Sequence, residues 1–508
     1  ANLGELFDVS TIVEFTSKER PLQMAERLLA NKPKIVGVGV YIWNIDQATQ
    51  LVQILKRACP TLIVVIGGPE VSYEWEDQLI FREADYLIRG EGDLAFAKLC
   101  REILRGRRAT EADSKHRFPV PKSRPTEPGG PGVNSEFAGA APADKVIDTP
   151  ELVLDEVQLP YDLYDDEDLA HRVILVEASR GCAFRCQFCL SAIDPRVRPF
   201  PAEPFFTALK GLYYRGVRRF KFVDRSFNFD QHRAERLLDF FLDECDEDCF
   251  VHIEVVPDRL HPGLRHRIER FPPGLLQLEL GVQTWTPDVA RRIGRRQDYG
   301  KLIDNLEFLT NNTGAHLHAD LVIGLPGESL DHIQQGFDAL FALNPHEIQV
   351  GILKRLRGAP IDRHSVAFAM VYSPIAPYEI LQNNSLAFDQ IKELRRFARV
   401  WDHVVNRGHF IDAAPLIWAG KPSVFEAFAS FVSYLYAEDT QAPMGFASLA
   451  RQLHRYLHQA GHPLAAVDAA LGADYRRVTK RQKIPAIFRS STQRPSKGPP
   501  KRQLLHRS

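Results

Sequence analysis

The stretch Ser179-Arg180-Gly181-Cys182-Ala183-Phe184-Arg185-Cys186-Gln187-Phe188-Cys189 places three cysteines within eight residues. It directly follows Val173–Ala178, a short apolar run that indicates a buried strand. Three thiolates this close together can bind one iron–sulfur cluster. A 4Fe–4S cluster has four irons, so three cysteines leave one iron open to bind a substrate or a cofactor.

Two other interpretations of these cysteines stay open. A structural zinc site needs four ligands, usually from paired Cys-x2-Cys units, so here a nearby histidine would have to complete it. The three cysteines can also be unliganded core thiols. The chain has seven cysteines, too few and too sparse for a disulfide scaffold. We expect the remaining four to be ordinary residues, although the last two can face each other on a helix: Cys59, Cys100, Cys245 and Cys249.

Strands and helices alternate on both sides of the cysteine stretch, which predicts a barrel over residues 151–365. The six strand candidates are Val173–Ala178, Phe220–Val223, Phe250–Val255, Leu276–Gly281, Leu317–Ile323 and Glu347–Leu353. The helical candidates between them include Phe205–Tyr214, Ala234–Asp243, Leu302–Thr310 and His332–Leu343. Six βα units fit a partial TIM barrel, whose functional site lies at the carboxyl ends of the strands. The cysteines follow the first of these strands, at that end.

A second alternation precedes the barrel and predicts a doubly wound, Rossmann-like α/β domain over residues 1–106. Its strand candidates are Val9–Phe15, Ile35–Ile42, Leu62–Ile66 and Tyr86–Ile88, and its helical candidates are Leu22–Ala30, Asp46–Arg57 and Leu94–Leu104. The opening residues, Ala1–Leu6, are typical of the end of a helix. We therefore expect the first strand of this domain to be missing from the sequence.

Three short motifs lie at the carboxyl ends of the predicted N-terminal strands, where such sheets bind ligands. They are Tyr41-Ile42-Trp43-Asn44, Gly67-Gly68-Pro69-Glu70 and Arg89-Gly90-Glu91-Gly92. Their glycines would let the backbone approach a large flat ligand or one that bears phosphate. A Gly-Gly-Pro sequence is also a common turn, so a purely structural role stays open.

The rest of the chain divides by composition. Residues 107–150 are rich in Pro, Gly, Ala and Ser, which is typical of a flexible linker. Residues 366–489 form a mostly helical region, with helical candidates Phe388–Val405, Val424–Tyr436 and Phe446–His458. Residues 490–508 are predicted to be a disordered basic tail whose charge is solvated.

Composition narrows the class of protein. Among the 508 residues, 44% are hydrophobic and 25% charged, as in ordinary globular proteins. No apolar run approaches the roughly 18 residues of a membrane span. The 64 Lys and Arg residues are balanced by 65 Asp and Glu, a net charge of -1, which argues against a protein that coats nucleic acid. Without a signal peptide at the start, we expect a cytoplasmic location.

The cysteine stretch resembles the signature of the radical S-adenosylmethionine superfamily, with Cys-x3-Cys-x2-Cys and Phe188 before the last cysteine. The preceding doubly wound module resembles the cobalamin-binding domain of one large subfamily. Further motifs are similar to the subgroup with a C-terminal helical domain of unknown function. Besides Tyr41–Asn44 and Gly67–Glu70, they are Phe222–Asn228, Glu279–Gln283 and Gly324–Glu328. The resemblance covers about residues 7–106 and 150–410, and the cysteine motif is its most specific element.

The resemblance implies that Cys182, Cys186 and Cys189 hold a 4Fe–4S cluster. The free iron of such a cluster chelates the amino and carboxylate groups of S-adenosylmethionine. One-electron reduction then cleaves the carbon–sulfur bond and gives a 5′-deoxyadenosyl radical. Phe188 would pack near the adenine, and the barrel would orient the cofactor and exclude water.

The resemblance also suggests further S-adenosylmethionine contacts, each with an alternative role in packing or capping. Asp224 ends the second strand and could bind the methionine ammonium, where many relatives have Gly-Gly-Glu. Glu279 and Gln283 could reach the ribose or the substrate. Gly324 and Gly327 would let the backbone run beside the adenine. His316, His318 and Asp320 alternate on one strand and therefore share one face, which could point into the barrel.

For cobalamin, the implied contacts are Tyr41, Trp43, Gly67, Gly68, Gly90 and Glu91. The sequence has no Asp-x-His-x-x-Gly, the motif that supplies a lower histidine ligand in many cobalamin proteins. If cobalamin binds, we therefore expect no such ligand. These residues would be plain packing and turn residues if the domain were degenerate.

We thus expect an enzyme that cleaves S-adenosylmethionine reductively and uses cobalamin for methyl transfer or radical rearrangement. Two alternatives remain: the same chemistry with a vestigial cobalamin domain, or a metal-stabilised module that binds RNA or protein. The expected partners are a small-molecule or unknown substrate and an electron donor such as flavodoxin or ferredoxin. No membrane partner is expected, nucleic acid is disfavoured, and no catalytic residue beyond the cluster ligands is assigned.

Overall fold

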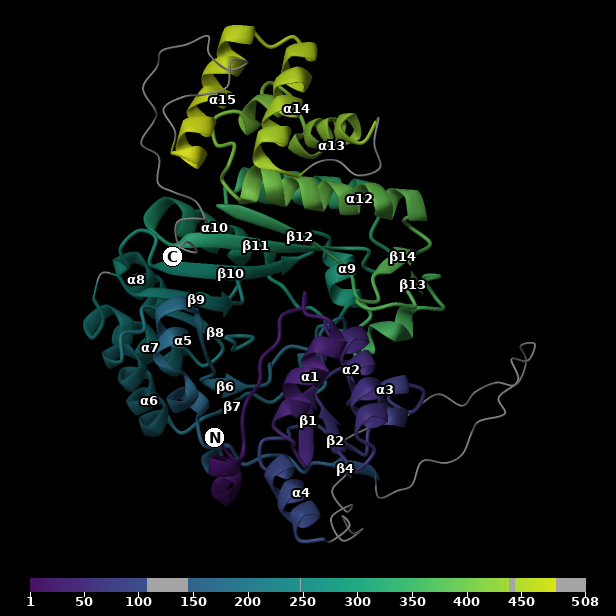
Figure 1. Cartoon of the computed structure of the whole chain (residues 1–508). Helices are drawn as coiled ribbons and strands as arrows, with labels where there is room; N and C mark the ends of the chain where they lie inside the picture. The colour runs from purple at the N-terminus through teal and green to yellow at the C-terminus, as the bar shows by residue number, and fades with distance from the viewer. Residues whose placement is uncertain (107–144, 247, 438–443, 481–508) are drawn as a thin grey trace, which may run out of the picture.

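The computed structural model describes residues 1–106, 145–246, 248–437 and 444–480. Three parts follow one another along the chain in Figure 1: a parallel sheet with helices (purple to blue), a six-stranded barrel (blue to teal) and a helical region (green to yellow). This confirms the fold class expected from the sequence. Within the described ranges, no helix is both long enough and apolar enough to span a membrane.

Six parallel strands form the barrel, in the order β12-β11-β10-β9-β8-β5. They are β5 (Ile174–Val176), β8 (Arg219–Phe222), β9 (Phe250–Val255), β10 (Leu276–Gln283), β11 (His316–Ile323) and β12 (Glu347–Ile352). Each overlaps one expected strand. The helices of the barrel are α6 (Ala202–Tyr214), α7 (Gln231–Asp243), α8 (Pro262–Arg270), α9 (Pro287–Arg292), α10 (Tyr299–Asn312) and α11 (Leu330–Ala342).

Apolar and polar residues alternate along the barrel strands, and this alternation separates two faces. In β10, Leu278 and Leu280 are fully buried and belong to the core shared with the helices. Because side chains alternate along a strand, Gln277 and Glu279 point to the opposite face. The same alternation in β9 and β11 gives the inner wall of the barrel a polar lining.

The N-terminal sheet has four parallel strands in the order β1-β2-β3-β4. The strands are β1 (Ile35–Gly39), β2 (Ile63–Gly67), β3 (Tyr86–Arg89) and β4 (Val146–Asp148). The helices are α1 (Pro21–Ala30), α2 (Ile45–Ala58), α3 (Leu79–Glu83) and α4 (Ala95–Leu104). Strand β4 lies within the range predicted as a linker, 107–150, and residues 107–144 of that range lie outside the described residues.

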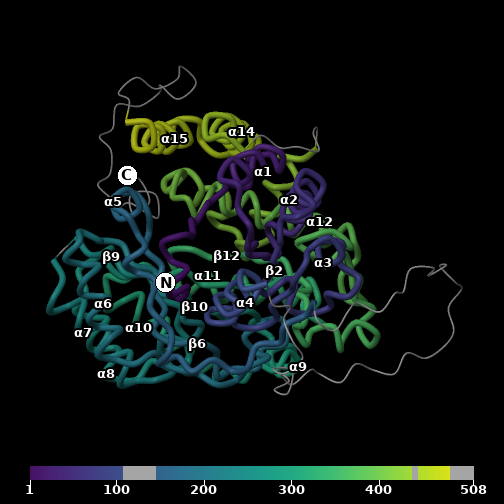
Figure 2. Tube along the Cα trace, turned by 60° about the horizontal axis from the view of Figure 1, so that its bottom comes forward, coloured from purple at the N-terminus to yellow at the C-terminus, as the bar shows by residue number. Residues whose placement is uncertain are grey.

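The strand expected over Val9–Phe15 was wrong. Gly4–Val9 forms a short 3-10 helix, and the following residues run without strand pairing to α1, as the purple trace in Figures 1 and 2 shows. Val9 and Ile12 are 80% and 74% exposed and do not face a core, whereas Phe15 at the end of the segment packs against the core of this domain. A strand needs a neighbour with free backbone groups as well as a suitable pattern, and β1 pairs here with β2 alone.

The C-terminal region packs on the last barrel strand. Its helices are α12 (Phe388–Trp401), α13 (Val424–Leu435), α14 (Phe446–Gln459) and α15 (Leu464–Thr479), and a short hairpin precedes them, β13 (Val371–Tyr372) with β14 (Ile380–Gln382). The Asn406 side chain accepts from the backbone N–H of Ile348 and donates to its carbonyl, at 3.2 and 3.0 Å, which fixes this region on β12. Stacked and edge-on aromatic rings, including Phe337, Phe397 and Trp401, fill the interface. The predicted tail, 490–508, lies outside the described residues.

Candidate functional site

The three clustered cysteines lie in a loop between two short antiparallel strands, β6 (Ser179–Arg180) and β7 (Arg198–Pro199). The loop leaves the carboxyl end of β5, as expected. Cys182 and Cys186 are buried, and Cys189 is partly exposed. Burial raises the pKa of the Cys182 and Cys186 thiols, and the neighbouring thiols raise it further. The loop therefore carries all three cysteines in one short, largely buried segment.

Contacts from α9 and its following turn fix the cysteine loop. The Gln187 N–H donates to the Ile293 carbonyl at 2.8 Å. Arg295 donates to Cys186 Sγ at 3.6 Å and to the Gly281 carbonyl at the end of β10. A positive guanidinium beside a thiol favours the thiolate, the form that binds metal. Three gathered thiols with an adjacent cation fit a 4Fe–4S cluster.

Within the described residues, no three His, Cys, Asp or Glu side chains converge on a position for a single metal ion. Cluster ligands bind different irons, so their sulfur atoms need not converge on one point. The geometry of the loop therefore gives no specific support to the mononuclear zinc interpretation.

The barrel lumen below the cysteine loop holds a network of charged side chains. His252 Nε2 lies 3.0 Å from Glu279 Oε2, and Lys221 Nζ lies 3.6 Å from the same oxygen. Burial opposes ionisation of Glu279, but the hydrogen bond with His252 and the nearby positive charges lower its pKa to about 2. Arg225 pairs with Glu254 at 3.2 Å. Glu279 is thus a fixed negative charge that can accept hydrogen bonds.

Asp320 lies on β11 beside this network, in register with Gly281 of β10. His318 Nε2 is 3.3 Å from Asp320 Oδ1. Burial, together with the charges of Glu279 and Glu254, raises the pKa of Asp320 well above its ordinary value. His318 and Asp320 therefore share the lumen face, as the sequence predicts, whereas His316 pairs with Glu347 at 2.8 Å on the neighbouring strand.

Asp224 lies at the expected place, after β8, but its carboxylate is already engaged. It accepts from the Ala178 N–H at 2.9 Å and from Ser179 Oγ at 2.5 Å. Both donors immediately precede the cysteine loop. Asp224 is also almost fully buried, which raises its pKa. These contacts make Asp224 a residue that positions the loop, and a direct contact with S-adenosylmethionine stays a prediction.

The other residues predicted to contact S-adenosylmethionine surround the same lumen. Phe188 packs partly buried against the barrel core. Gln283 ends β10 with a positive φ of 70°. Gly324 and Gly327 follow β11 with φ of 92° and 77°, and at Gly324 an added Cβ would lie 2.5 Å from the Ile380 side chain. Glycine is therefore needed to keep this backbone close to its neighbours.

Glu328, next to Gly327, makes the fold sensitive to pH. It is 3% exposed, one carboxylate oxygen bonds Thr284, and the other has no hydrogen-bond partner in the described structure. Burial raises its pKa to about 7. We therefore expect the contribution of Glu328 to folding stability to fall as pH rises from 4.5 to about 7, because the Glu328 carboxyl ionises in that range in the unfolded chain but not in the folded one. We expect Glu328→Gln to remove a loss of about 3 kcal/mol, seen as a smaller difference between denaturation curves at pH 5 and pH 8. Exposed Glu269→Gln should leave that difference unchanged, and an equal change in both variants would contradict the assignment.

The carboxyl edge of the N-terminal sheet opens into a cavity of about 1710 Å³. Both parts of the chain line it: Gly67, Gly68 and Gly90 from the sheet, and Glu177 and Arg180 from the barrel. Its volume exceeds the roughly 300–1,000 Å³ of ordinary small-molecule pockets, so it has room for a ligand as large as cobalamin. Tyr41 and Trp43, predicted cobalamin contacts, stack 4.5 Å apart within 7° of parallel at its edge.

Gly68 is required by close backbone contact. Its φ is 116°, and an added Cβ would lie 2.5 Å from the Val40 carbonyl oxygen. We expect Gly68→Ala to destabilise the N-terminal domain by roughly 2 kcal/mol and to weaken cobalamin binding, measured by denaturation and by titration with hydroxocobalamin. Gly106→Ala is the matched control, because Gly106 has φ of 71° but no neighbour within 4 Å. Equal losses in both variants would show that the contact with Val40 is unimportant.

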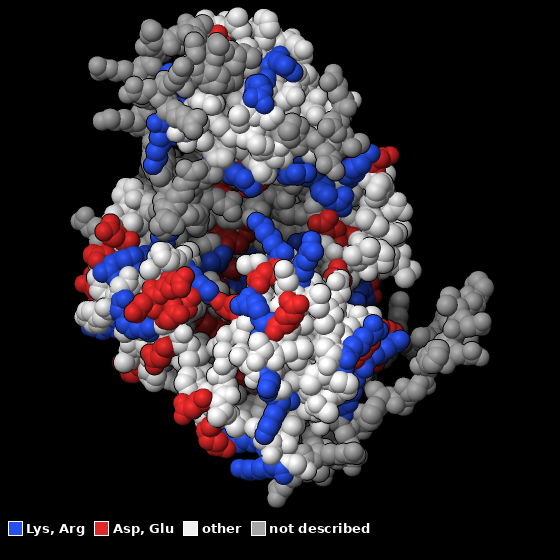
Figure 3. Space-filling view, viewed as in Figure 1, with Lys and Arg blue, Asp and Glu red and all other residues white. Residues whose placement is uncertain are grey.

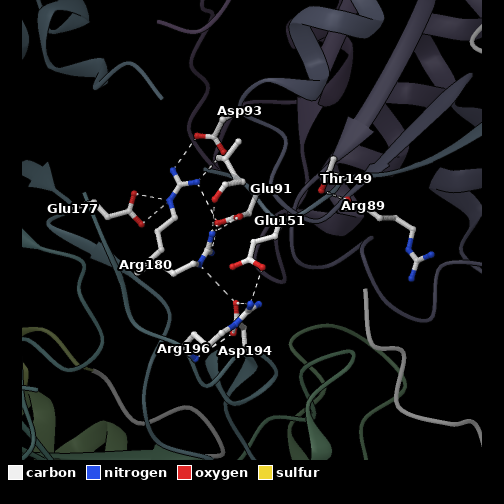
Figure 4. Close-up of polar contacts among 11 residues, drawn as sticks. Arg89, Glu91, Asp93, Thr149, Glu151, Glu177, Arg180, Asp194 and Arg196 are labelled. Atoms are coloured by element: carbon white, nitrogen blue, oxygen red, sulfur yellow. Dashed lines mark hydrogen bonds and ion pairs between the residues drawn. The ribbon is translucent and has the colours of Figure 1, made fainter. Parts of the chain in front are cut away.

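Glu91, a predicted cobalamin contact, lines the cavity and also pairs with the barrel. We call Glu91, Asp93, Glu177, Arg180 and Arg198 the inter-domain ion-pair network (Figure 4). Arg180 binds both oxygens of Asp93 at 2.9 Å and Glu177 at 3.1 Å, while Arg198 binds Glu91 at 2.7 Å. Arg180 immediately precedes Gly181 and Cys182, so the network joins the loop after β3 to the cysteine loop. In Figure 4, Arg196 also contacts Asp194 and Glu151 nearby.

A second set of contacts joins the domains through the Gly67–Glu70 motif. Glu70 is 3% exposed and accepts from Arg357 Nε at 2.9 Å and Tyr378 Oη at 2.8 Å. Arg355 pairs with Glu74 at 2.9 Å in the same interface. The motif therefore ends in a carboxylate that docks the N-terminal domain on the loop after β12.

Several site residues were missed in the sequence. Arg180 stands inside the quoted motif, but its partners are about 90 residues upstream. Arg295 lies in Arg291-Arg292-Ile293-Gly294-Arg295-Arg296, a basic run whose proximity to the cysteines is a matter of folding alone. Glu254 follows the apolar–polar alternation of β9, and this signal was available in the sequence.

Cys245 and Cys249 are neighbours, but not on a helix. Both follow the end of α7, and their mutual hydrogen bond and burial raise the pKa of Cys249. Among the residues described, these two cysteines make no contact with the cysteine loop. Nothing in their surroundings therefore suggests a part in binding a cluster.

The structure combines an N-terminal doubly wound domain with a six-stranded barrel whose three-cysteine loop lies at the carboxyl end of the first strand, which is the arrangement expected from the resemblance to radical S-adenosylmethionine enzymes. Family models match in the same order. The B12 binding domain model matches residues 4–100, the radical SAM superfamily model matches 176–340, and a model for a protein of unknown function (DUF4080) matches 367–506. The chain thus carries a B12-binding domain, a radical SAM domain and a C-terminal DUF4080 domain in this order, as the resemblance suggested.

Curated relatives are distant. An uncharacterized methyltransferase of Pyrococcus horikoshii is 22% identical over 388 residues, which cover 72% of this chain and 78% of that protein. The cobalamin-dependent radical SAM methyltransferase TokK of Streptomyces tokunonensis is 26% identical over 357 residues, or 67% of this chain and 49% of TokK. This chain therefore spans about half the length of TokK.

Among solved structures, the fold is similar to that of OxsB, a cobalamin-dependent S-adenosylmethionine radical enzyme with aqua-cobalamin bound. The TM-score is 0.55 at 14% identity, over 91% of this chain and 73% of OxsB. At 14% identity, the match supports a similar fold in the two proteins and nothing further.

Proposed function

We propose that this chain is a cobalamin-dependent methyltransferase that acts on a small molecule. The main observation in support is that the carboxyl edge of the N-terminal sheet and the cysteine loop line one cavity. Arg180, which pairs with Asp93, joins the two. A methyl carrier at the sheet edge would therefore lie beside a radical source at the cysteine loop.

Different residues of the chain would bind the cluster, S-adenosylmethionine and the substrate. Cys182, Cys186 and Cys189 would hold the cluster, and Arg295 offers a cation for the carboxylate of S-adenosylmethionine. Glu279, held ionised by His252 and Lys221, can accept from hydroxyl or ammonium groups in the lumen. When bound, the cluster supplies one electron that cleaves S-adenosylmethionine, and cobalamin supplies a transferable methyl group.

The edge of the N-terminal sheet would hold cobalamin through Tyr41, Trp43, Gly67, Gly68 and Gly90, which line the cavity. Residues 1–106 contain no histidine, so this part of the chain has none to offer as a lower ligand. Glu91 is occupied by Arg198 and contributes to the site as an anchor of the loop.

Anaerobic reconstitution with iron, sulfide and hydroxocobalamin tests the proposal. With a reductant and S-adenosylmethionine, we expect 5′-deoxyadenosine, which reports reductive cleavage, and S-adenosylhomocysteine, which reports methyl removal. The second product should appear only with cobalamin. If 5′-deoxyadenosine forms equally well without cobalamin and S-adenosylhomocysteine is absent, the vestigial-domain alternative holds. Neither product, in a preparation loaded with zinc, would favour the binding module.

The proposed partners and location follow from the same chemistry. A one-electron donor protein is required, the substrate is a small molecule that enters the lumen, and a reducing cytoplasm suits free cysteines and an iron–sulfur cluster. On the face shown in Figure 3, Lys and Arg side chains are interspersed with Asp and Glu, which supports the expectation that nucleic acid is not a partner.

A further inference from the structure

Three segments that are distant in sequence meet at the cysteine loop, and each carries an exposed arginine there. Arg185 lies within the loop, Arg291 and Arg296 flank the turn after α9, and Arg363 lies beyond β12. We call these four residues the arginine face.

Backbone and side-chain contacts place these segments against one another. Gln187 donates its N–H to the Ile293 carbonyl at 2.8 Å. Gly294 has φ of 74°, and an added Cβ would lie 2.5 Å from the Arg185 carbonyl oxygen. His364 Nε2 lies 2.5 Å from Gln187 Oε1. The segments that carry the arginine face are therefore packed against the loop that holds Cys182, Cys186 and Cys189.

The charges of this face are largely uncompensated. Arg291 pairs with Asp288 one turn away, in an exposed pair of little energetic weight. Arg363 donates to the Pro360 carbonyl. Among the described residues, the structure places no carboxylate within ion-pair distance of Arg185 or Arg296. The pKa of His364 responds to this field: burial lowers it, and the charges of Arg363 and Arg292 lower it further.

The opposite flank of the loop differs. There, Arg180 and Arg198 are partly buried and paired with Glu91, Asp93 and Glu177 in the interface with the N-terminal domain. That flank is closed by the chain itself. The arginine face is exposed, positively charged and close to the cysteines.

We propose that the arginine face is the docking site for an acidic one-electron carrier protein. The inference rests on the proposed function, because it presumes a cluster at the cysteine loop. One electron leaves the carrier, which is oxidised, and reaches the cluster. From there it enters S-adenosylmethionine, whose carbon–sulfur bond breaks to give methionine and the 5′-deoxyadenosyl radical. A positive surface attracts an acidic partner, accelerates its encounter and makes the rate sensitive to salt.

The test compares two reductants on the anaerobically reconstituted holoenzyme. Photoreduced 5-deazariboflavin is small and neutral, whereas a reduced flavodoxin with an acidic surface must dock. The test variant is R291E/R296E/R363E, which leaves the residues of the cysteine loop unchanged. The matched control, R57E/R270E/R455E, reverses the same number of exposed arginines on α2, α8 and α14.

For the test variant we expect the KM for flavodoxin in 5′-deoxyadenosine formation to rise at least about 10-fold and its salt dependence to weaken. The rate with 5-deazariboflavin should stay within about 2-fold of the wild type, because that reductant has no charge for the face to attract. The control variant should behave as wild type with both reductants. An unchanged KM for flavodoxin in the test variant would overturn the proposal.

Further measurements distinguish a failure of the docking proposal from a failure of the proposed function, from loss of the cluster and from binding of nucleic acid. If the wild type gives no 5′-deoxyadenosine with 5-deazariboflavin, the proposed function fails and not the docking site alone. If the triple variant loses iron, Arg296→Glu and its charge-preserving partner Arg296→Lys replace it, since Arg296 lies outside the cysteine loop. Loss of binding to an RNA oligonucleotide with an unchanged KM for flavodoxin would instead assign the face to nucleic acid.

Discussion

Cys186→Ala is expected to abolish the cleavage of S-adenosylmethionine. Cys186 is buried, lies beside Cys182 and Cys189, and receives a hydrogen bond from Arg295. The substitution would remove one of the three proposed cluster ligands, and the loop has no other cysteine to replace it. The loss should exceed the roughly 10–100-fold effects typical of residues that only support a metal ligand.

Iron content, the absorbance of the reconstituted protein and 5′-deoxyadenosine formation measure this effect. Cys182→Ala and Cys189→Ala should behave like Cys186→Ala. Cys249→Ala is the matched control, because Cys249 is also buried but lies after α7. Full iron content and activity in Cys186→Ala would refute the assignment of the cysteine loop.

Arg180→Met is expected to weaken the interface between the N-terminal domain and the barrel while leaving each domain folded. The side chain of Arg180 is 19% exposed and compensates Glu91, Asp93 and Glu177. Burial alone would raise the pKa of Asp93, yet Arg180 holds it below the ordinary value. Without the guanidinium, three neighbouring carboxylates would lose a shared cation in a partly buried interface.

Complete removal of one partner from a fully buried ion pair costs about 3–5 kcal/mol, and the partial exposure of Arg180 reduces our expectation to about 2 kcal/mol. Arg180→Met should weaken hydroxocobalamin binding by about 10-fold or more and speed hydrogen exchange in residues 89–93 and 177–182. Arg180→Lys should recover part of the affinity. Arg196→Met is the control, since Arg196 is 57% exposed and its pairs contribute little. Equal effects of Arg180→Met and Arg196→Met would argue against the network.

Sequence reasoning was most successful where periodicity is strong. Along β10 and β11, buried leucines alternate with polar residues, and this pattern alone identified the strands and the shared face of His318 and Asp320. The cysteine spacing placed all three predicted ligands in one loop because they lie in one short segment. Local patterns of this kind carry their own geometry.

Prediction was weakest where structure depends on a distant partner. Val9–Phe15 has a strand-like composition, but no described strand pairs with it. Strand β4 is short and follows residues 107–144, so its apolar residues were assigned to the linker. The ion pair of Glu91 with Arg198, which lies about a hundred residues later, could not be predicted from the place of Glu91 after β3.

The inter-domain network also bears on how this chain can be recombined. Glu91 and Asp93 of the N-terminal domain form ion pairs with Arg180 and Arg198 of the barrel. The N-terminal domain therefore cannot be exchanged on its own without leaving these arginines unpaired. An N-terminal domain transplanted from a relative would meet unmatched arginines at the junction unless its loop after β3 supplied equivalent carboxylates. Chimeras should therefore exchange residues 89–93 and 177–198 as one unit, and the junction, more than either domain core, would decide whether they assemble.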